Sequence, residues 1–188
     1  MKTDIILAGV GGQGVLSVAA IIAQGAVKAG LQARQSEVHG MAQRGGAVLA
    51  HLRVADGPIP SDLVPQGGAG LIIALEPLES LRYLRWLKAD GALVTAGEPF
   101  CNIDPYPDLT LIIKAIESLP HYRIIPAESL AKEAGLPKAV NMVMVGAASR
   151  FLPIPREKLE EAMADSFAAK DPSIAAANRK AFALGAGG

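Results

Sequence analysis

The sequence predicts an α/β fold: a doubly wound, mainly parallel, Rossmann-like sheet with helices on both faces and a helical C-terminal third. Apolar runs with few alternating polar residues are typical of strands buried on both faces. Helical patterns lie between these runs, as right-handed βαβ crossovers require. A glycine-rich turn joins the first strand to the first helix. The 188 residues fit one domain, which spans 1–188.

Six apolar runs predict strands, of which four are expected to be buried on both faces and two more polar ones suit positions nearer an edge. The runs expected to be buried on both faces are 4–10, 69–77, 91–97 and 122–127, and the more polar runs are 31–38 and 47–54. The helical patterns span residues 15–29, 77–88, 127–134, 140–151, 156–168 and 174–184. The terminal sequence GAGG is expected to fray.

Composition narrows the class of function. The chain has 18 basic and 18 acidic residues without a basic block, which argues against nucleic acid as a main partner. Cys101 is the only cysteine, so this chain alone can form neither a disulfide nor a Cys-ligated iron–sulfur cluster. The N-terminus lacks a signal-peptide pattern, and no stretch of about 18 apolar residues occurs. We therefore expect a soluble, cytoplasmic protein without a membrane partner.

The stretch GVGGQGVLS lies between the first predicted strand and the first predicted helix. Gly9, Gly11 and Gly14 satisfy the pattern G-x-G-x-x-G, in which backbone N–H groups can face a pyrophosphate at the helix N-terminus. A nicotinamide cofactor also needs an acid roughly 20 residues later, and Glu37 is close to that place. However, Glu37 is followed by a second glycine-rich segment instead of a crossover helix. Three interpretations stay open: bound NAD or NADP, another phosphate-bearing ligand, or a tight junction without a ligand.

A second candidate binding segment is EVHGMAQRGGAVLAHLRV, which covers residues 37–54. It brings together His39, Gln43, Arg44, Gly45, Gly46 and His51. Glycines let a loop approach a ligand closely, and an arginine can hold phosphate or carboxylate through two hydrogen bonds. On a doubly wound sheet this loop can lie near the first glycine turn. The alternative is a solvated loop in which Arg44 forms a structural ion pair or a subunit contact.

Other chemistry-bearing residues carry weaker signals. The three histidines show no metal-ligand spacing, and no Ser or Cys stands in a nucleophile-elbow context. We therefore assign neither a metal site nor a catalytic residue. Cys101 is interpreted as a small filler, and Asn141 as a residue that begins or caps an apolar helix. The leucines and Trp86 in PLESLRYLRWLK form an ordinary amphipathic face.

Four stretches together carry a resemblance to a known family. They are GVGGQGVLSVAAIIA, SEVHGMAQRGGAVLAHLRV, LEPLESLRYLRWLK and, near the C-terminus, AVNMVMVGAASRFLPIPREKLEEAM with ANRKAFALG. In this order they resemble the gamma-type subunit of 2-oxoacid:ferredoxin oxidoreductases, most of all the small (beta) subunit of the indolepyruvate branch. The branch assignment rests on EVHGMAQRGG, because pyruvate-type relatives tend to carry a tyrosine-and-glutamate variant before RGG.

The resemblance implies an oxidative decarboxylation in which a 2-oxoacid, coenzyme A and oxidised ferredoxin give an acyl-CoA, carbon dioxide and reduced ferredoxin. It also implies that a large alpha subunit holds the thiamine diphosphate and the iron–sulfur clusters. The small chain would hold no cofactor alone, complete the assembly and contribute to coenzyme A binding. Ferredoxin would be reached through the complex, and the isolated chain can form a homodimer through the partner surface.

The residues expected to face a phosphate or the partner come from both glycine segments. They are Gly9, Gly11, Gly12, Gln13, Gly14, Arg44, Gly45 and Gly46. Two other functions remain as alternatives. An independent NAD(P)-dependent oxidoreductase would use the same glycine turn, and a regulatory module would bind a nucleotide without a large partner.

Overall fold

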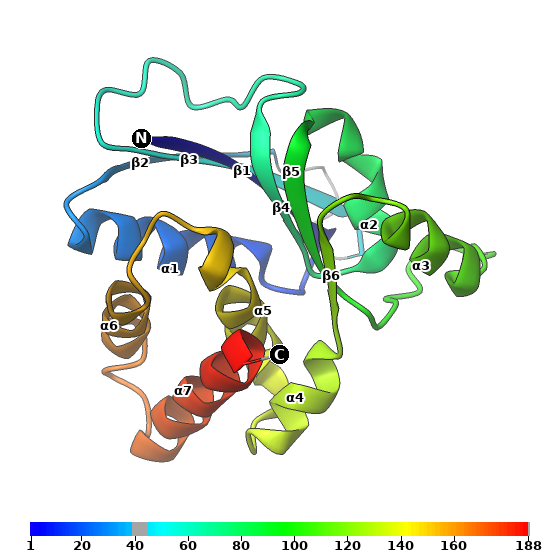
Figure 1. Ribbon diagram of the computed structural model, residues 1–188. Coiled ribbons are helices and arrows are strands. Elements are labelled where there is room, and N and C mark those ends of the chain that lie inside the picture. Colours follow the sequence, from blue (N-terminus) through cyan, green and yellow to red (C-terminus); the bar gives the residue numbers. More distant parts are fainter. Residues whose placement is uncertain (39–44, 188) are drawn as a thin grey trace.

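The computed structural model describes residues 1–38 and 45–187, in which a six-stranded sheet lies between two layers of helices (Figure 1). The strand order is β2-β3-β1-β4-β5-β6. The strands are β1 (Lys2–Val10), β2 (Gln32–Val38), β3 (Ala47–Ala55), β4 (Ala69–Ala74), β5 (Leu87–Ala96) and β6 (Tyr122–Ile125). Strands β1, β4, β5 and β6 run parallel, whereas β3 is antiparallel to both of its neighbours, β1 and β2. The predicted α/β class is confirmed, and the sheet is mixed because of β3.

The helices divide between the two faces of the sheet (Figure 1). The first layer contains α1 (Val15–Lys28), α4 (Ala127–Glu133), η2 (Pro137–Ala139), α5 (Val140–Ala148), η3 (Ser149–Phe151), α6 (Arg156–Ser166) and α7 (Pro172–Gly187). The second layer contains α2 (Pro77–Arg82), η1 (Leu84–Trp86) and α3 (Leu109–Glu117). Alternate residues of β1 face different layers, since Ile5 and Leu7 belong to the first core and Ile6 to the second. Burial of both faces explains why the strands read as continuous apolar runs.

One helix prediction needs correction, and one helix was not predicted. The pattern over residues 77–88 contains only the short helix α2 and the 3₁₀ turn η1, and β5 already begins at Leu87. Apolar residues continue at helical spacing beyond residue 82, which is why a longer helix was predicted. The helix nevertheless ends at Arg82, because the backbone angles of Tyr83 are not helical. Helix α3 was not predicted at all, although Asp108 caps it by accepting a hydrogen bond from the Thr110 N–H at 2.8 Å.

The C-terminal helix packs closely against α5 through two glycines. A Cβ atom on Gly146 would lie 2.1 Å from the Phe182 carbonyl oxygen, and one on Gly185 would lie 2.0 Å from the Val143 carbonyl oxygen. Only glycine allows the two backbones to approach this closely. The expectation that GAGG frays is therefore wrong for residues 185–187, which continue α7.

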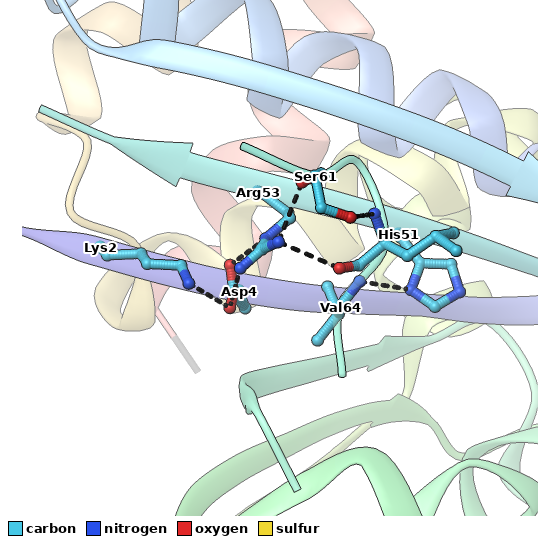
Figure 2. Close-up of polar contacts among 7 residues, drawn as sticks. Lys2, Asp4, His51, Arg53, Ser61 and Val64 are labelled. Carbon is cyan, nitrogen blue, oxygen red and sulfur yellow. Dashed lines mark hydrogen bonds and ion pairs between the residues drawn. The ribbon is translucent and has the colours of Figure 1, made fainter. Parts of the chain in front are cut away.

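A buried ion pair joins β1 to β3 and fastens the long loop after β3 (Figure 2). Asp4 and Arg53 lie opposite each other in the strand register and are each 5% exposed. Arg53 Nε and Nη2 donate to the two Asp4 carboxylate oxygens at 2.8 and 3.0 Å. Arg53 Nη1 donates to the carbonyl oxygens of Ser61 and Leu63 at 2.9 and 3.0 Å, so the guanidinium holds this loop over the sheet.

The neighbouring His51 is part of the same fastening and not of a binding loop. Its Nδ1 accepts a hydrogen bond from the Val64 N–H at 3.1 Å (Figure 2). Burial, and then the nearby Arg53 charge, lower the pKa of His51, which favours the neutral ring that can accept this bond. His51 therefore supports the second face of the sheet.

We expect Asp4→Asn to lower the free energy of unfolding by about 3–5 kcal/mol, because it leaves the buried Arg53 charge without its partner. The matched control is Arg34→Gln, which breaks an exposed ion pair between β2 and Asp62 of the same loop. That change should cost less than about 1 kcal/mol. Urea denaturation of both full-length variants measures the difference. Equal costs for the two variants would show that burial of the Asp4–Arg53 pair is unimportant.

Candidate functional site

The glycine turn borders a crevice at the point where the strand order reverses. From β1 the chain continues to one side of the sheet with β2 and β3 and then crosses to the other side with β4. Ligands of open α/β sheets bind outside the carboxyl ends of the strands at such a switch point. Here a cavity of about 420 Å³ is lined by Gly12, Gln13 and Gly14 after β1, by Leu75 after β4, and by Ala96 and Glu98 at the end of β5.

The turn itself is built from left-handed glycines and one bridging side chain. Gly12 and Gly14 have φ angles of 102° and 83°, which other residues rarely adopt. Gln13 Oε1 accepts a hydrogen bond from the Val10 N–H at 2.8 Å, and its Nε2 donates to the Leu75 carbonyl oxygen at 3.0 Å. Gln13 thus ties the end of β1 to the end of β4 beneath the crevice. Gly9 allows close packing, because a Cβ atom there would lie 2.8 Å from Val15 Cγ2.

The two predicted glycine segments meet. The Gly11 N–H donates to the Gly46 carbonyl oxygen at 2.8 Å, and the Gly45 N–H donates to the Gly11 carbonyl oxygen at 3.3 Å. Asn102, from the loop after β5, adds a hydrogen bond from its Nδ2 to the Gly45 carbonyl oxygen at 2.8 Å. The other three residues named in this segment, His39, Gln43 and Arg44, lie outside the described residues.

Asn141 stands at the start of α5, as one of its two interpretations expected, but it does not cap the helix and contacts the glycine turn instead. The cap position of α5 is Ala139, and Asn141 is the second residue of the helix. Its Nδ2 lies 3.4 Å from the Gly14 carbonyl oxygen and donates a hydrogen bond to it. A Cβ atom on Gly14 would lie only 2.3 Å from that nitrogen, so Gly14 is needed for both its backbone angle and its space.

The crevice has an uncapped helix N-terminus and a lysine at its border, and Glu98 and Glu128 also line it. Helix α1 starts at Gly14 without a side-chain cap and without an acidic residue in its first turn, so its dipole is not neutralised there. Lys138 lines the same cavity. By contrast, Glu98 accepts hydrogen bonds from the N–H groups of Ala127 and Glu128 at 3.1 and 3.2 Å and thereby caps α4. The N-terminus of α4 is therefore capped, whereas the N-termini of α1 and α5, which also border the crevice, have no side-chain cap.

The rim of the crevice is held by a buried carboxylate that sequence reasoning missed. Glu76 follows β4 and is 1% exposed. One of its oxygens accepts from the Glu79 N–H at 2.7 Å, which caps α2, and the other accepts the Tyr106 hydroxyl. Burial raises the pKa of Tyr106 well above its usual value, and the hydrogen bond to Glu76 and the negative charge of Glu76 raise it further. Glu76 thereby fixes the loop whose Phe100 lines the cavity. In the sequence, the position of Glu76 after an apolar run was the signal that could have indicated its role.

The strand order disfavours a nicotinamide cofactor. In a dinucleotide fold the acid that binds the ribose ends the strand beside β1. Here β3 occupies that place, and β2, which carries Glu37, lies one strand farther from the glycine turn. Within residues 1–38 and 45–187, no three His, Cys, Asp or Glu side chains group as metal ligands. No helix of this described part is long and apolar enough to cross a membrane.

These features define a doubly wound α/β protein with an uncapped helix N-terminus at its switch point. Comparison with known families gives a narrower assignment. The family model for pyruvate ferredoxin/flavodoxin oxidoreductase matches residues 4–187, and the chain belongs to this family.

Individual relatives agree with this assignment. The chain is 38% identical to indolepyruvate oxidoreductase subunit IorB of Archaeoglobus fulgidus, over 98% of this chain and 94% of the relative. It is 28% identical to 2-oxoglutarate synthase subunit KorC of Methanocaldococcus jannaschii, over 88% and 84% of the two chains. A structure of 2-oxoglutarate:ferredoxin oxidoreductase from Magnetococcus marinus with 2-oxoglutarate, coenzyme A and succinyl-CoA bound has a TM-score of 0.78 at 24% identity. That match covers 98% of this chain and 30% of the longer one.

We expect Gly14→Ala to lower the free energy of unfolding by about 3 kcal/mol, because it adds left-handed strain to a clash with Asn141. In an Asn141→Ala background the cost should fall to about 1–2 kcal/mol, the strain alone. Gly12→Ala is the matched control, since nothing lies within 4 Å of its Cβ position, and it should also cost only about 1–2 kcal/mol. A double-mutant cycle by urea denaturation measures the coupling. No coupling between positions 14 and 141 would contradict this account of the turn.

Proposed function

We propose that the chain is the small subunit of an indolepyruvate-type 2-oxoacid:ferredoxin oxidoreductase. The assembled enzyme would convert an aryl pyruvate, coenzyme A and oxidised ferredoxin into an acyl-CoA, carbon dioxide and reduced ferredoxin. The higher identity to the indolepyruvate relative, 38% against 28% for the 2-oxoglutarate relative, supports this branch. The near full-length coverage of both chains supports a separate subunit of this size.

The residues of this chain support a division of labour with a large alpha subunit. With Cys101 as its only cysteine, the chain cannot supply the four thiolates of an iron–sulfur cluster. The described residues therefore do not fit such a cluster, and we assign the clusters and the thiamine diphosphate to the large subunit. The small chain then contributes binding surface instead of redox chemistry.

The contribution that the geometry supports best is binding of the phosphates of coenzyme A. The observation that carries this proposal is the uncapped N-terminus of α1, which faces a cavity of about 420 Å³ beside Lys138. Backbone N–H groups at a helix N-terminus and a lysine together favour a phosphate. The related structure from Magnetococcus marinus holds coenzyme A, which agrees with this choice of ligand. Within the candidate site, the turn at residues 9–14 would contact the phosphate, and Gly45 and Gly46 would support the turn from below.

Anaerobic purification of the tagged chain from its native host tests the subunit assignment. We expect a large iron-rich partner with thiamine diphosphate, and viologen reduction that requires indolepyruvate and coenzyme A. Activity with 2-oxoglutarate in place of indolepyruvate would retain the subunit role and reject the branch. Recovery of the chain alone with a tightly bound nucleotide would reject the subunit role itself.

In the assembled enzyme, Lys138→Gln should raise the KM for coenzyme A about tenfold or more, because a charge-assisted contact to phosphate is lost. The kcat should change little, since the contact is far from the reacting thiol and is made equally before and during the reaction. Lys114→Gln on α3 is the matched control, because this exposed lysine lies on the opposite layer. Steady-state kinetics at varied coenzyme A concentration separate the two parameters. An unchanged KM would remove Lys138 from the phosphate site.

A further inference from the structure

The loop after β5 and the first turn of α3 present an exposed apolar surface beside the mouth of the crevice. Its large side chains are Phe100, Ile103 and Leu111, which are 45%, 39% and 64% exposed. Other exposed large apolar side chains, such as Val27 of α1, stand alone in their segments. Single exposed apolar residues are normal, whereas a gathering of them marks a contact surface. We call residues 99–111 the rim segment.

Three hydrogen bonds hold the rim segment in place from beneath. The buried Glu76 accepts the Phe100 N–H at 3.4 Å and also accepts the Tyr106 hydroxyl. Asn102 Nδ2 donates to the Gly45 carbonyl oxygen at 2.8 Å, which ties the segment to the glycine turn. A loop that is fixed before association loses little conformational freedom on binding. The rim segment is therefore suited to a lasting contact with another protein.

The charges of the rim segment are all negative. No lysine, arginine or histidine occurs between residues 98 and 113. Asp104 is exposed in the loop, and Asp108 caps the N-terminus of α3. Charged groups across an interface are arranged with opposite signs. In a symmetric dimer the same surface meets itself, which would set acidic groups against acidic groups. The charges therefore favour a different protein with a basic group over a second copy of this chain.

We propose that the rim segment is the surface on which the large subunit docks, with apolar residues against Phe100, Ile103 and Leu111. A basic side chain of the large subunit would lie opposite Asp104. This inference rests on the proposed function and adds to it the surface that joins the two chains. Phe100 also lines the crevice. The docked subunit would therefore cover one side of the crevice and shield a ligand held there from water.

Co-purification of the large subunit with tagged variants of the full-length small chain tests the proposal. Leu111→Glu should reduce the recovery of the large subunit at least tenfold, because it buries a carboxylate in an apolar contact. Ile103→Glu should have the same effect. The matched control is Val27→Glu, because Val27 is 63% exposed and lies on α1 in the other layer, so its recovery should equal that of the wild type. Urea denaturation of the variants confirms that each is folded.

Cys101 gives an independent measurement on the unmodified sequence. It is exposed within the rim segment and is the only cysteine of the chain. An uncharged maleimide should modify Cys101 at least tenfold more slowly in the assembled enzyme than in the isolated chain, because the docked subunit covers it. Mass spectrometry of the small chain measures this modification apart from any cysteine of the large subunit.

The outcomes separate the docking surface from the subunit assignment. Equal recovery of the large subunit by all three variants, or equal modification rates of Cys101, would overturn the docking surface. Recovery of no large subunit by the wild-type chain would instead reject the proposed function. A wild-type chain that is dimeric by light scattering, and that Leu111→Glu makes monomeric, would assign the surface to a second copy and overturn the proposal.

Discussion

The crevice depends on the antiparallel pairing of β3 with β1. Because β3 runs in the opposite direction, its first residue, Ala47, lies opposite Val10 at the carboxyl end of β1. This pairing brings Gly45 and Gly46 onto the glycine turn, where they bond to Gly11. A parallel strand in the same place would have brought its last residues there instead. The Asp4–Arg53 ion pair near the other end of the two strands fixes the register, since a shift of one residue would turn Arg53 toward the apolar core of the first layer.

Local chemistry made most of the fold predictable from the sequence. The strand runs, the first helix and the glycine junction follow from apolar runs and from glycines that only a tight turn requires. The meeting of the two glycine segments was also predicted, although the antiparallel direction of β3 was not. Helix α3 could have been found, because Asp108 stands before an apolar helical pattern.

The rest of the candidate site could not be predicted because it comes from distant segments. Asn141 reaches Gly14 across 127 residues of chain, and nothing near it in the sequence indicates that contact. Glu98 has the same property: it stands after a strand like any loop residue, yet it caps α4 about thirty residues later in the chain. At the crevice, α4 is capped by Glu98, whereas α1 has no side-chain cap, so the dipole of α1 is not offset there. Such a contrast exists only once the helices are packed.

The described residues also suggest why a binding role suits this chain better than a catalytic one. The crevice is lined by the glycine turn, Lys138, apolar walls and the polar side chains of Gln13, Glu98, Glu128 and Asn141. Of these, Gln13, Glu98 and Asn141 make hydrogen bonds that hold the fold. On the proposed function, the chain grips coenzyme A by the end that carries the phosphates, far from the thiol that reacts. Binding energy from such a remote part of a substrate serves to position the reacting end and to offset the entropy lost on ordering it. A subunit of this kind would therefore affect the reaction through the placement of the thiol, and its removal would impair acyl transfer while leaving the partner's redox groups in place.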